Sequence, residues 1–314
     1  MQRRYNPAHL ILARVVVLGL SLLMVEVDAQ AQVVFSSNRA GNWEIYVMDT
    51  DGRNQRRVTR NPFPNDQPSW SPDGERIAYT FSRDGNLEIY VMDTDGRNPL
   101  NLTNNPHRDA NPAWSPNGEH IIFDSKREGN REIYVMDTDG KNLRRLTNNP
   151  VDDWQPSWSP DGKSIAFVSG GDENREIYVM DADGGNPLNL TNNPHDEFHP
   201  SWSPDSKHIT FASTRDRNLE IYIMDADGGN QQNLTNNPAL DYLPSWSPDG
   251  GHVVFSSDRA GNFDIYVMDA DGGNPLNLTN NPHEDLNPVW FGPAFSVSPT
   301  GKKFTIWGWL KQVD

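Results

Sequence analysis

The chain has 314 residues, with 43 acidic and 27 basic side chains, a formal net charge of −16 at pH 7 and no cysteine. A surface with this excess of negative charge repels nucleic-acid phosphates and anionic lipids, so we expect neither as a partner and favour cationic partners instead. Without disulfides the fold must be stabilised by a buried core, for which this length is sufficient.

Residues 1–31 have the pattern of an export signal. Arg3 and Arg4 form a basic start, an apolar run extends from Val15 to Val25, and residues 29–31 read A-Q-A, the small-residue pattern of a cleavage site. The apolar run is short for a membrane span. We therefore expect cleavage, no membrane insertion afterwards, and a periplasmic or extracellular protein. The alternative is an uncleaved anchor.

Residues 32–291 contain six copies of one repeat. A tyrosine and a tryptophan each recur every 44 residues without an insertion. The two series are Tyr46, Tyr90, Tyr134, Tyr178, Tyr222 and Tyr266, and Trp70, Trp114, Trp158, Trp202, Trp246 and Trp290.

Each copy has the pattern of four short strands. A P-S-W strand ends in an S-P-D-G turn, and an apolar run follows, such as R-I-A-Y-T at 76–80. After a polar turn come the E-I-Y-V-M-D strand, a D-x-D-G turn and the x-L-N-L-T strand. Gly and Pro turns between short strands favour antiparallel meanders, and such a unit repeated at this length is typical of a propeller blade. The sequence therefore predicts an all-β, six-bladed β-propeller.

The two ends of the repeat region complement each other. The first copy begins at Val33 without a P-S-W strand, whereas the last copy is followed by a spare one at 288–290. We expect the spare strand to complete the first blade, which closes the ring and protects its edges, so a monomer is expected. Residues 292–314 form a C-terminal tail, in which 298–306 predict either an appended hairpin or a part in closure.

The strings W-S-P-D-G and E-I-Y-V-M-D-x-D-G resemble the WD40-like repeats of the TolB-type β-propeller family. All six copies match in the second half, and five carry W-S-P. The resemblance implies a propeller and, as a class of function, protein interaction at the cell envelope. The 314 residues offer no counterpart of the N-terminal α/β domain of TolB proteins, so a TolB role in an envelope complex is not implied.

Catalytic signatures are missing from the sequence. It contains no G-x-S-x-G, no H-E-x-x-H, no phosphate-binding glycine loop and no cysteine. We therefore expect no enzyme activity and no cofactor.

The D-x-D-G-x-N strings, such as Asp49, Asp51 and Asn54, have two interpretations. Each offers three side chains, fewer than calcium requires, and no downstream acid completes the set. Asp-Gly between strands is a strong hairpin signal. We favour turns, with a calcium-stabilised scaffold as the alternative.

The string H-D-E-F-H, from His195 to His199, has a spacing that brings two imidazoles together only on a helix. It precedes Pro200 in a loop, and His195 has equivalents at His107 and His283, in every second copy. We expect no zinc site here.

Residues that differ between the copies are better candidates for function than those that are shared. Five residues before each tryptophan, one loop carries Asn65, Asp109, Asp153, Glu197, Asp241 and Asp285. A second loop at the same end of the blades carries Arg39, Arg83, Arg127, Gly171, Arg215 and Arg259. The acids either form a negative rim or pair with the arginines, and we favour pairing. Pairing within blades would leave Asp153 and Arg83 without these partners.

One position after the acids stand Asp66, Ala110, Trp154, Phe198, Tyr242 and Leu286. The three successive aromatics predict an arc at the mouth of the channel, and exposed aromatics are common binding hot spots. The alternative is that each ring packs under its own loop. We expect a non-catalytic, exported scaffold that binds a protein or peptide, preferentially cationic, through Trp154, Phe198, Tyr242 and the acids Asp109, Asp153, Glu197, Asp241 and Asp285. A carbohydrate-binding or lyase-like propeller is the alternative.

Overall fold

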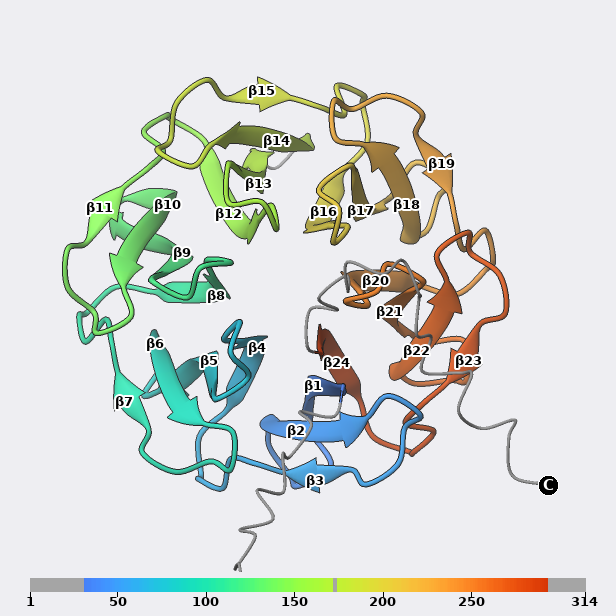
Figure 1. Ribbon diagram of the computed structural model, residues 1–314, viewed down its shortest axis with the longest axis horizontal. Helices are drawn as coiled ribbons and strands as arrows, with labels where there is room; N and C mark the ends of the chain where they lie inside the picture. Colours follow the sequence, from blue (N-terminus) through green and yellow to red (C-terminus); the bar gives the residue numbers. More distant parts are fainter. Residues whose placement is uncertain (1–30, 172–173, 293–314) are drawn as a thin grey trace, which may run out of the picture.

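The computed structural model describes residues 31–171 and 174–292, which form six four-stranded antiparallel sheets arranged as the blades of a ring (Figure 1). This confirms the predicted six-bladed β-propeller. The predicted export signal, apart from Ala31, and the predicted tail beyond Gly292 lie outside the described residues.

We number the blades along the chain, and each runs from an inner strand at the channel to an outer strand at the rim. The inner strands of blades 1 to 6 are β24 (Asp285–Phe291), β4 (Asn65–Trp70), β8 (Asp109–Trp114), β12 (Asp152–Trp158), β16 (Glu197–Trp202) and β20 (Asp241–Trp246). The second strands are β1 (Gln32–Ser37), β5 (Arg76–Arg83), β9 (His120–Glu128), β13 (Ser164–Gly170), β17 (His208–Ser213) and β21 (His252–Ser257).

The third strands are β2 (Glu44–Asp49), β6 (Asn86–Asp93), β10 (Asn130–Asp137), β14 (Arg175–Asp181), β18 (Glu220–Asp225) and β22 (Asp264–Asp269). The outer strands are β3 (Arg56–Arg57), β7 (Leu100–Asn101), β11 (Arg144–Arg145), β15 (Leu188–Asn189), β19 (Gln232–Asn233) and β23 (Leu276–Asn277). Within the described ranges, no helix is long and apolar enough to cross a bilayer.

The ring is closed by the last strand of the repeat region. β24 pairs antiparallel with β1, with Val33 opposite Trp290 and Val34 opposite Val289, and so completes blade 1. The prediction that the spare C-terminal strand completes the first blade is confirmed. The pairing gives β1 a neighbour on both sides, as the second strand of every other blade has.

The hydrophobic core lies between neighbouring blades. Trp114 of blade 3 packs in one cluster with Ala78, Ile89 and Leu102 of blade 2. Each of the other blade pairs also shares an apolar cluster. The tryptophan is almost fully buried, and burial of a side chain of this size contributes about 2–3 kcal/mol. Adjacent blades therefore stabilise each other. A single blade would not be stable alone, because both of its apolar faces would be exposed to water.

The D-x-D-G strings form the turns between third and outer strands, as predicted. In blade 1 the Asp51 carboxylate accepts a hydrogen bond from the Arg53 backbone NH (3.0 Å), and the Asn54 amide donates to the Asp49 carboxylate (2.6 Å). A Cβ on Gly52, at φ +81°, would lie 2.3 Å from the Leu278 carbonyl oxygen of the neighbouring blade. Glycine is required here because the next blade approaches so closely.

Candidate functional site

The meander places two sets of connections at each end of the propeller. One end, which we call the loop face, carries the segments that join each outer strand to the next inner strand and each second strand to its third strand. The first of these sets comprises residues 58–64, 102–108, 146–151, 190–196, 234–240 and 278–284. The opposite end carries the S-P-D-G and D-x-D-G turns.

A buried acid on each third strand fixes the loop face. In blade 3 the Glu132 carboxylate accepts hydrogen bonds from the Thr147 hydroxyl (2.6 Å) and the Asn149 backbone NH (3.3 Å). The Asn149 side chain then donates to Asp153 at the start of the next blade (2.5 Å). The T-N-N-P string, which reads T-R-N-P at 59–62, recurs in the connections, and the backbone NH of its last asparagine donates to the buried acid in each blade.

Four of the five predicted acids pair with arginines of their own blades. The nitrogen–oxygen distances are 2.7 Å for Arg39–Asp285, 3.1 Å for Arg127–Asp109, 3.0 Å for Arg215–Glu197 and 2.8 Å for Arg259–Asp241. All four carboxylates are buried. The favoured pairing interpretation therefore holds in four blades, and the negative-rim interpretation is wrong there because these carboxylates lie inside the blades. Their role in partner binding stays a prediction that this geometry does not favour.

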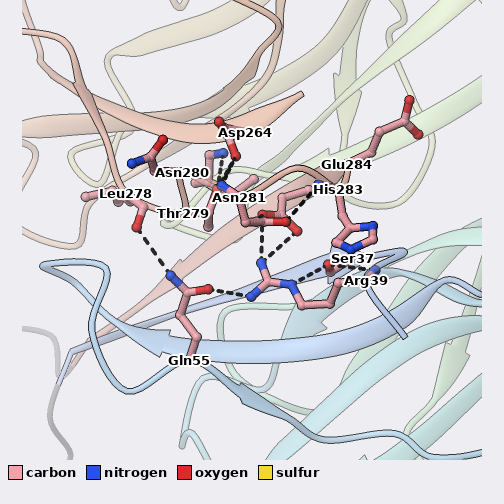
Figure 2. A network of polar contacts seen from close by, with 12 residues as sticks. Ser37, Arg39, Gln55, Asp264, Leu278, Thr279, Asn280, Asn281, His283 and Glu284 are labelled. Carbon is pink, nitrogen blue, oxygen red and sulfur yellow. Dashed lines mark hydrogen bonds and ion pairs between the residues drawn. The ribbon is translucent and has the colours of Figure 1, made fainter. Parts of the chain in front are cut away.

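Each paired arginine lies in a pocket of the same construction. In blade 1, Nε of Arg39 donates to the Ser37 hydroxyl (2.8 Å), Nη1 donates to Gln55 (2.6 Å), and the guanidinium lies 4.9 Å from the centre of the Tyr46 ring. Figure 2 shows the Arg39 guanidinium between Ser37 and Gln55. Carboxylate, hydroxyl and aromatic ring together bind a planar, forked cation.

Blades 2 and 4 depart from this pattern, as the sequence predicted. In blade 4 the arginine position is Gly171, and Asp153 is buried with Oδ1 lacking a hydrogen-bond partner among the described residues. Burial raises the pKa of Asp153 to about 6. In blade 2 the acid position is Asn65, and the side chain of Arg83 is 68% exposed, 3.5 Å from Asp84.

Trp154 is covered by the preceding blade. Its side chain is 7% exposed, and the Arg131 guanidinium lies 5.2 Å from the ring centre. Arg131 also approaches the Asp152 carboxylate (3.8 Å). The alternative that the ring packs within the fold therefore describes Trp154, although an arginine of blade 3 covers it rather than its own loop.

Phe198 and Tyr242 are partly exposed. Phe198 lies 5.6 Å from the Arg175 guanidinium of the preceding blade. Tyr242 contacts the edges of Phe263 (5.3 Å between ring centres) and His199 (5.9 Å). Burial raises the pKa of Tyr242 to about 12, so its hydroxyl is neutral. The predicted arc thus consists of one buried ring and two partly exposed rings, which also pack against the hydrophobic core.

A ring of six residues in the channel was missed by the sequence analysis. These residues directly precede the shared proline of each inner strand and have φ between +52° and +60°. They are Gln67, Asn111, Gln155, His199, Leu243 and Asn287. Each lies where the inner strand shifts register against its neighbour or next to that point, so a bulge turns the residue toward the channel.

The channel residues line a cavity of about 260 Å³. The Gln155 side-chain oxygen accepts a hydrogen bond from the His199 backbone NH (3.0 Å), and that of Gln67 accepts one from the Asn111 backbone NH (3.2 Å). Burial lowers the pKa of His199, so the imidazole is neutral near pH 7. Among the described residues, no group of three or more His, Cys, Asp or Glu side chains could hold a metal ion. The sequence does contain a signal for this ring: all six copies share the proline of the inner strand, whereas the residue before it varies between copies.

Comparison with known proteins places this geometry in a family. The family model of the TolB beta propeller domain matches residues 100–196 and 188–306. The family model of the Tricorn protease N-terminal beta propeller domain matches residues 29–132. Short segments match Tol-Pal system protein TolB from Desulfosudis oleivorans (43% identity over 51 residues) and Actinobacillus succinogenes (52% over 40 residues). These segments cover 16% and 13% of this chain, and only 12% and 9% of those relatives.

Solved structures match over most of the propeller. TolB from Acinetobacter baumannii has 26% identity and a TM-score of 0.72, with 84% of this chain and 67% of that chain covered. The hydrazine synthase of Kuenenia stuttgartiensis, at 18% identity and a TM-score of 0.71, shares the fold; 83% of this chain and 46% of that chain are covered. With a family model spanning residues 100–306 in two overlapping matches, the chain belongs to the TolB beta propeller domain family.

Proposed function

We propose that this chain is a non-catalytic, exported scaffold of the cell envelope that binds a protein partner on its loop face. The observation that carries the proposal is that the six copies share the residues that build the blades and differ mainly at this one end. Family membership supports the class of function, because the named relatives belong to the Tol-Pal system. The sequence pattern of residues 1–31 supports export and a periplasmic location.

The partly exposed rings Phe198 and Tyr242 are the proposed contact points. They lie on adjacent blades, close to connections whose backbone donates hydrogen bonds to the buried acids Glu176 and Glu220. A rigid surface with aromatic anchors loses little conformational entropy on binding, so it suits recognition of a protein. The net charge of −16 favours a partner with a cationic surface.

The test is capture of a partner from a native envelope fraction by the chain without residues 1–31. We expect the double variant Phe198→Ala/Tyr242→Ala to lower the captured amount at least about tenfold, since a hot spot contributes about 2 kcal/mol or more. The control is Leu188→Ala/Leu276→Ala, which removes two exposed apolar side chains from the outer rim. Equal capture by the folded double variant and the control would contradict the proposal.

A further inference from the structure

Four blades hold their own arginine in a pocket with the same four walls. The acid and a serine lie opposite each other on the inner and second strands, as Asp241 and Ser257 do in blade 6. A phenylalanine and a tyrosine lie opposite each other on the second and third strands, as Phe255 and Tyr266 do. Arg259 fills this pocket: Nε donates to Ser257 (2.8 Å) and Nη2 to Asp241 (2.8 Å), and the guanidinium lies 4.9 Å from the Tyr266 ring centre.

Blade 4 has all four walls but no arginine. Asp153 is opposite Ser169, and Phe167 is opposite Tyr178, in the same register as in blade 6. The Phe167 and Tyr178 rings are 5.9 Å apart at 35°, against 5.9 Å and 34° for the corresponding pair of blade 6. The arginine position is Gly171. The four residues that surround the arginine in blade 6 therefore have equivalents in blade 4 with the same geometry.

Blade 2 lacks the two polar residues that form part of this pocket. There the acid is Asn65, and the serine is replaced by Phe81, whose ring lies 4.8 Å from that of Tyr90. The arginine of this blade, Arg83, lies outside and exposed. Blade 2 therefore lacks the acid and the serine of the pocket as well as the ion pair. Blade 4 lacks only the arginine.

Two features of blade 4 are those of a pocket that lacks its cation. Asp153 is 0% exposed, and its Oδ1 has no hydrogen-bond partner among residues 31–171 and 174–292. Tyr178 is partly exposed, whereas the tyrosines beneath Arg39, Arg127 and Arg259 are buried. A buried carboxylate without a counter-charge is costly, so this site favours binding of a cation from outside the chain.

We propose that blade 4 binds an arginine side chain of a protein partner on the loop face, with the guanidinium between Asp153, Ser169 and the rings of Phe167 and Tyr178. This inference rests on the proposed function for its claim that the arginine belongs to a protein. A guanidinium is favoured over an ammonium because the pocket offers an acceptor for Nε, a carboxylate for Nη and a flat ring to stack on.

The first test uses N-ethylguanidinium, which reproduces the end of an arginine side chain, at millimolar concentration. We expect N-ethylguanidinium to raise the melting temperature of the wild-type chain. In calorimetry it should bind once per chain, and more tightly than ethylammonium does. Gly171→Arg fills the pocket from within and should abolish both effects. A Cβ at Gly171 meets no atom within 4 Å, so the backbone at this position accepts a side chain. Asp153→Asn should also abolish binding.

A matched variant shows whether the assay can detect such a pocket. Arg127→Gly removes the guanidinium from blade 3 and leaves Asp109, Ser125, Phe123 and Tyr134 in place. We expect this variant to bind two equivalents of N-ethylguanidinium. Binding of one equivalent by Arg127→Gly and none by the wild type, or an equal effect on wild type and Gly171→Arg, would overturn the proposal.

The second test uses the capped peptide Gly-Arg-Gly and its citrulline analogue, in which the charge is removed. The wild type should bind the arginine peptide at least tenfold more tightly than the citrulline peptide, and Gly171→Arg should lose this preference. Binding of N-ethylguanidinium without binding of the arginine peptide would overturn the proposal, because a side chain on a backbone could then not reach the pocket. Failure of envelope capture by every variant would instead contradict the proposed function and leave these peptide results standing.

Discussion

The Arg39 guanidinium lies 2.7 Å from the Asp285 carboxylate, although the two residues are 246 positions apart in the chain. Arg39 lies just after β1 and Asp285 begins β24, so the pair joins the connection after the first strand to the last strand within blade 1. Equivalent ion pairs lie in blades 3, 5 and 6, where they join segments that are close in the chain. In blade 1 the same ion pair contributes to ring closure.

Removal of this arginine should destabilise the fold. We expect Arg39→Ala to lower the free energy of unfolding by about 3 kcal/mol, because the buried Asp285 carboxylate is left without its cation. Arg83→Ala is the matched control, since its side chain is 68% exposed, and it should change the free energy by less than about 0.5 kcal/mol. Urea unfolding followed by tryptophan fluorescence measures both. Similar midpoints for the two variants would contradict this account of closure.

The pH dependence of stability should reveal Asp153. Its pKa is raised to about 6 in the folded chain, above the value of about 4 in an unfolded chain, so the folded state binds the proton more tightly. The resulting stabilisation is fully present below about pH 4 and is lost as the pH rises through 6, by about 2–3 kcal/mol at most.

Asp153→Asn removes this titration. The variant should be more stable than the wild type at pH 7.5, and the difference between the two should shrink as the pH falls to 4. Thermal melts across this range measure the difference. A constant difference, or one that grows toward acid pH, would show that Asp153 does not titrate in this way.

The D-x-D-G turns should tolerate no side chain at glycine where the next blade approaches. In blade 6 a Cβ at Gly272, with φ of +87°, would lie 2.3 Å from the Leu234 carbonyl oxygen. Gly272→Ala should cost about 2–4 kcal/mol from strain and displacement of the neighbouring blade. Gly261→Ala, with φ of +106° and no atom within 4 Å, should cost only about 1 kcal/mol. Equal midpoints in urea would argue against close blade contact at this turn.

Chelation should leave the propeller unchanged. In each D-x-D-G-x-N string, one aspartate bonds the turn backbone and the asparagine bonds the other aspartate, as Asp271, Asn274 and Asp269 do. These oxygens serve the hairpin, and three side chains are too few for calcium. We expect the melting temperature to be the same with calcium and with excess EDTA. A fall of several degrees on chelation would instead support the calcium-stabilised scaffold.

The fold could be predicted from the sequence because the length, number and strand pattern of the repeats are typical of a propeller. The unbroken spacing of Tyr and Trp, and the spare strand at 288–290, were sufficient to predict six blades and their closure. The ion pairs could also be predicted, since acid and arginine occupy loops at one end of each blade. Even the two exceptions, Asp153 and Arg83, followed from the mismatch between the two series.

Contacts that depend on backbone detail could not be predicted. The bulge in each inner strand turns Gln155 and its equivalents toward the channel, and simple strand alternation gives no sign of it. Trp154 is covered by Arg131 of the preceding blade, and this contact depends on the spacing and twist between blades. A pattern within one repeat contains no information on that spacing, so it does not decide between an exposed ring and a packed one.

The most direct test of the proposed loop face is site-specific photo-crosslinking in the native envelope. A benzophenone side chain is placed at Val151, which is 37% exposed on the loop face, or at Leu143, which is 43% exposed beside a D-x-D-G turn at the opposite end. We predict a defined crosslinked protein from position 151 and none from position 143. Crosslinks from position 143 alone, or from neither position, would contradict a partner-binding role for the loop face.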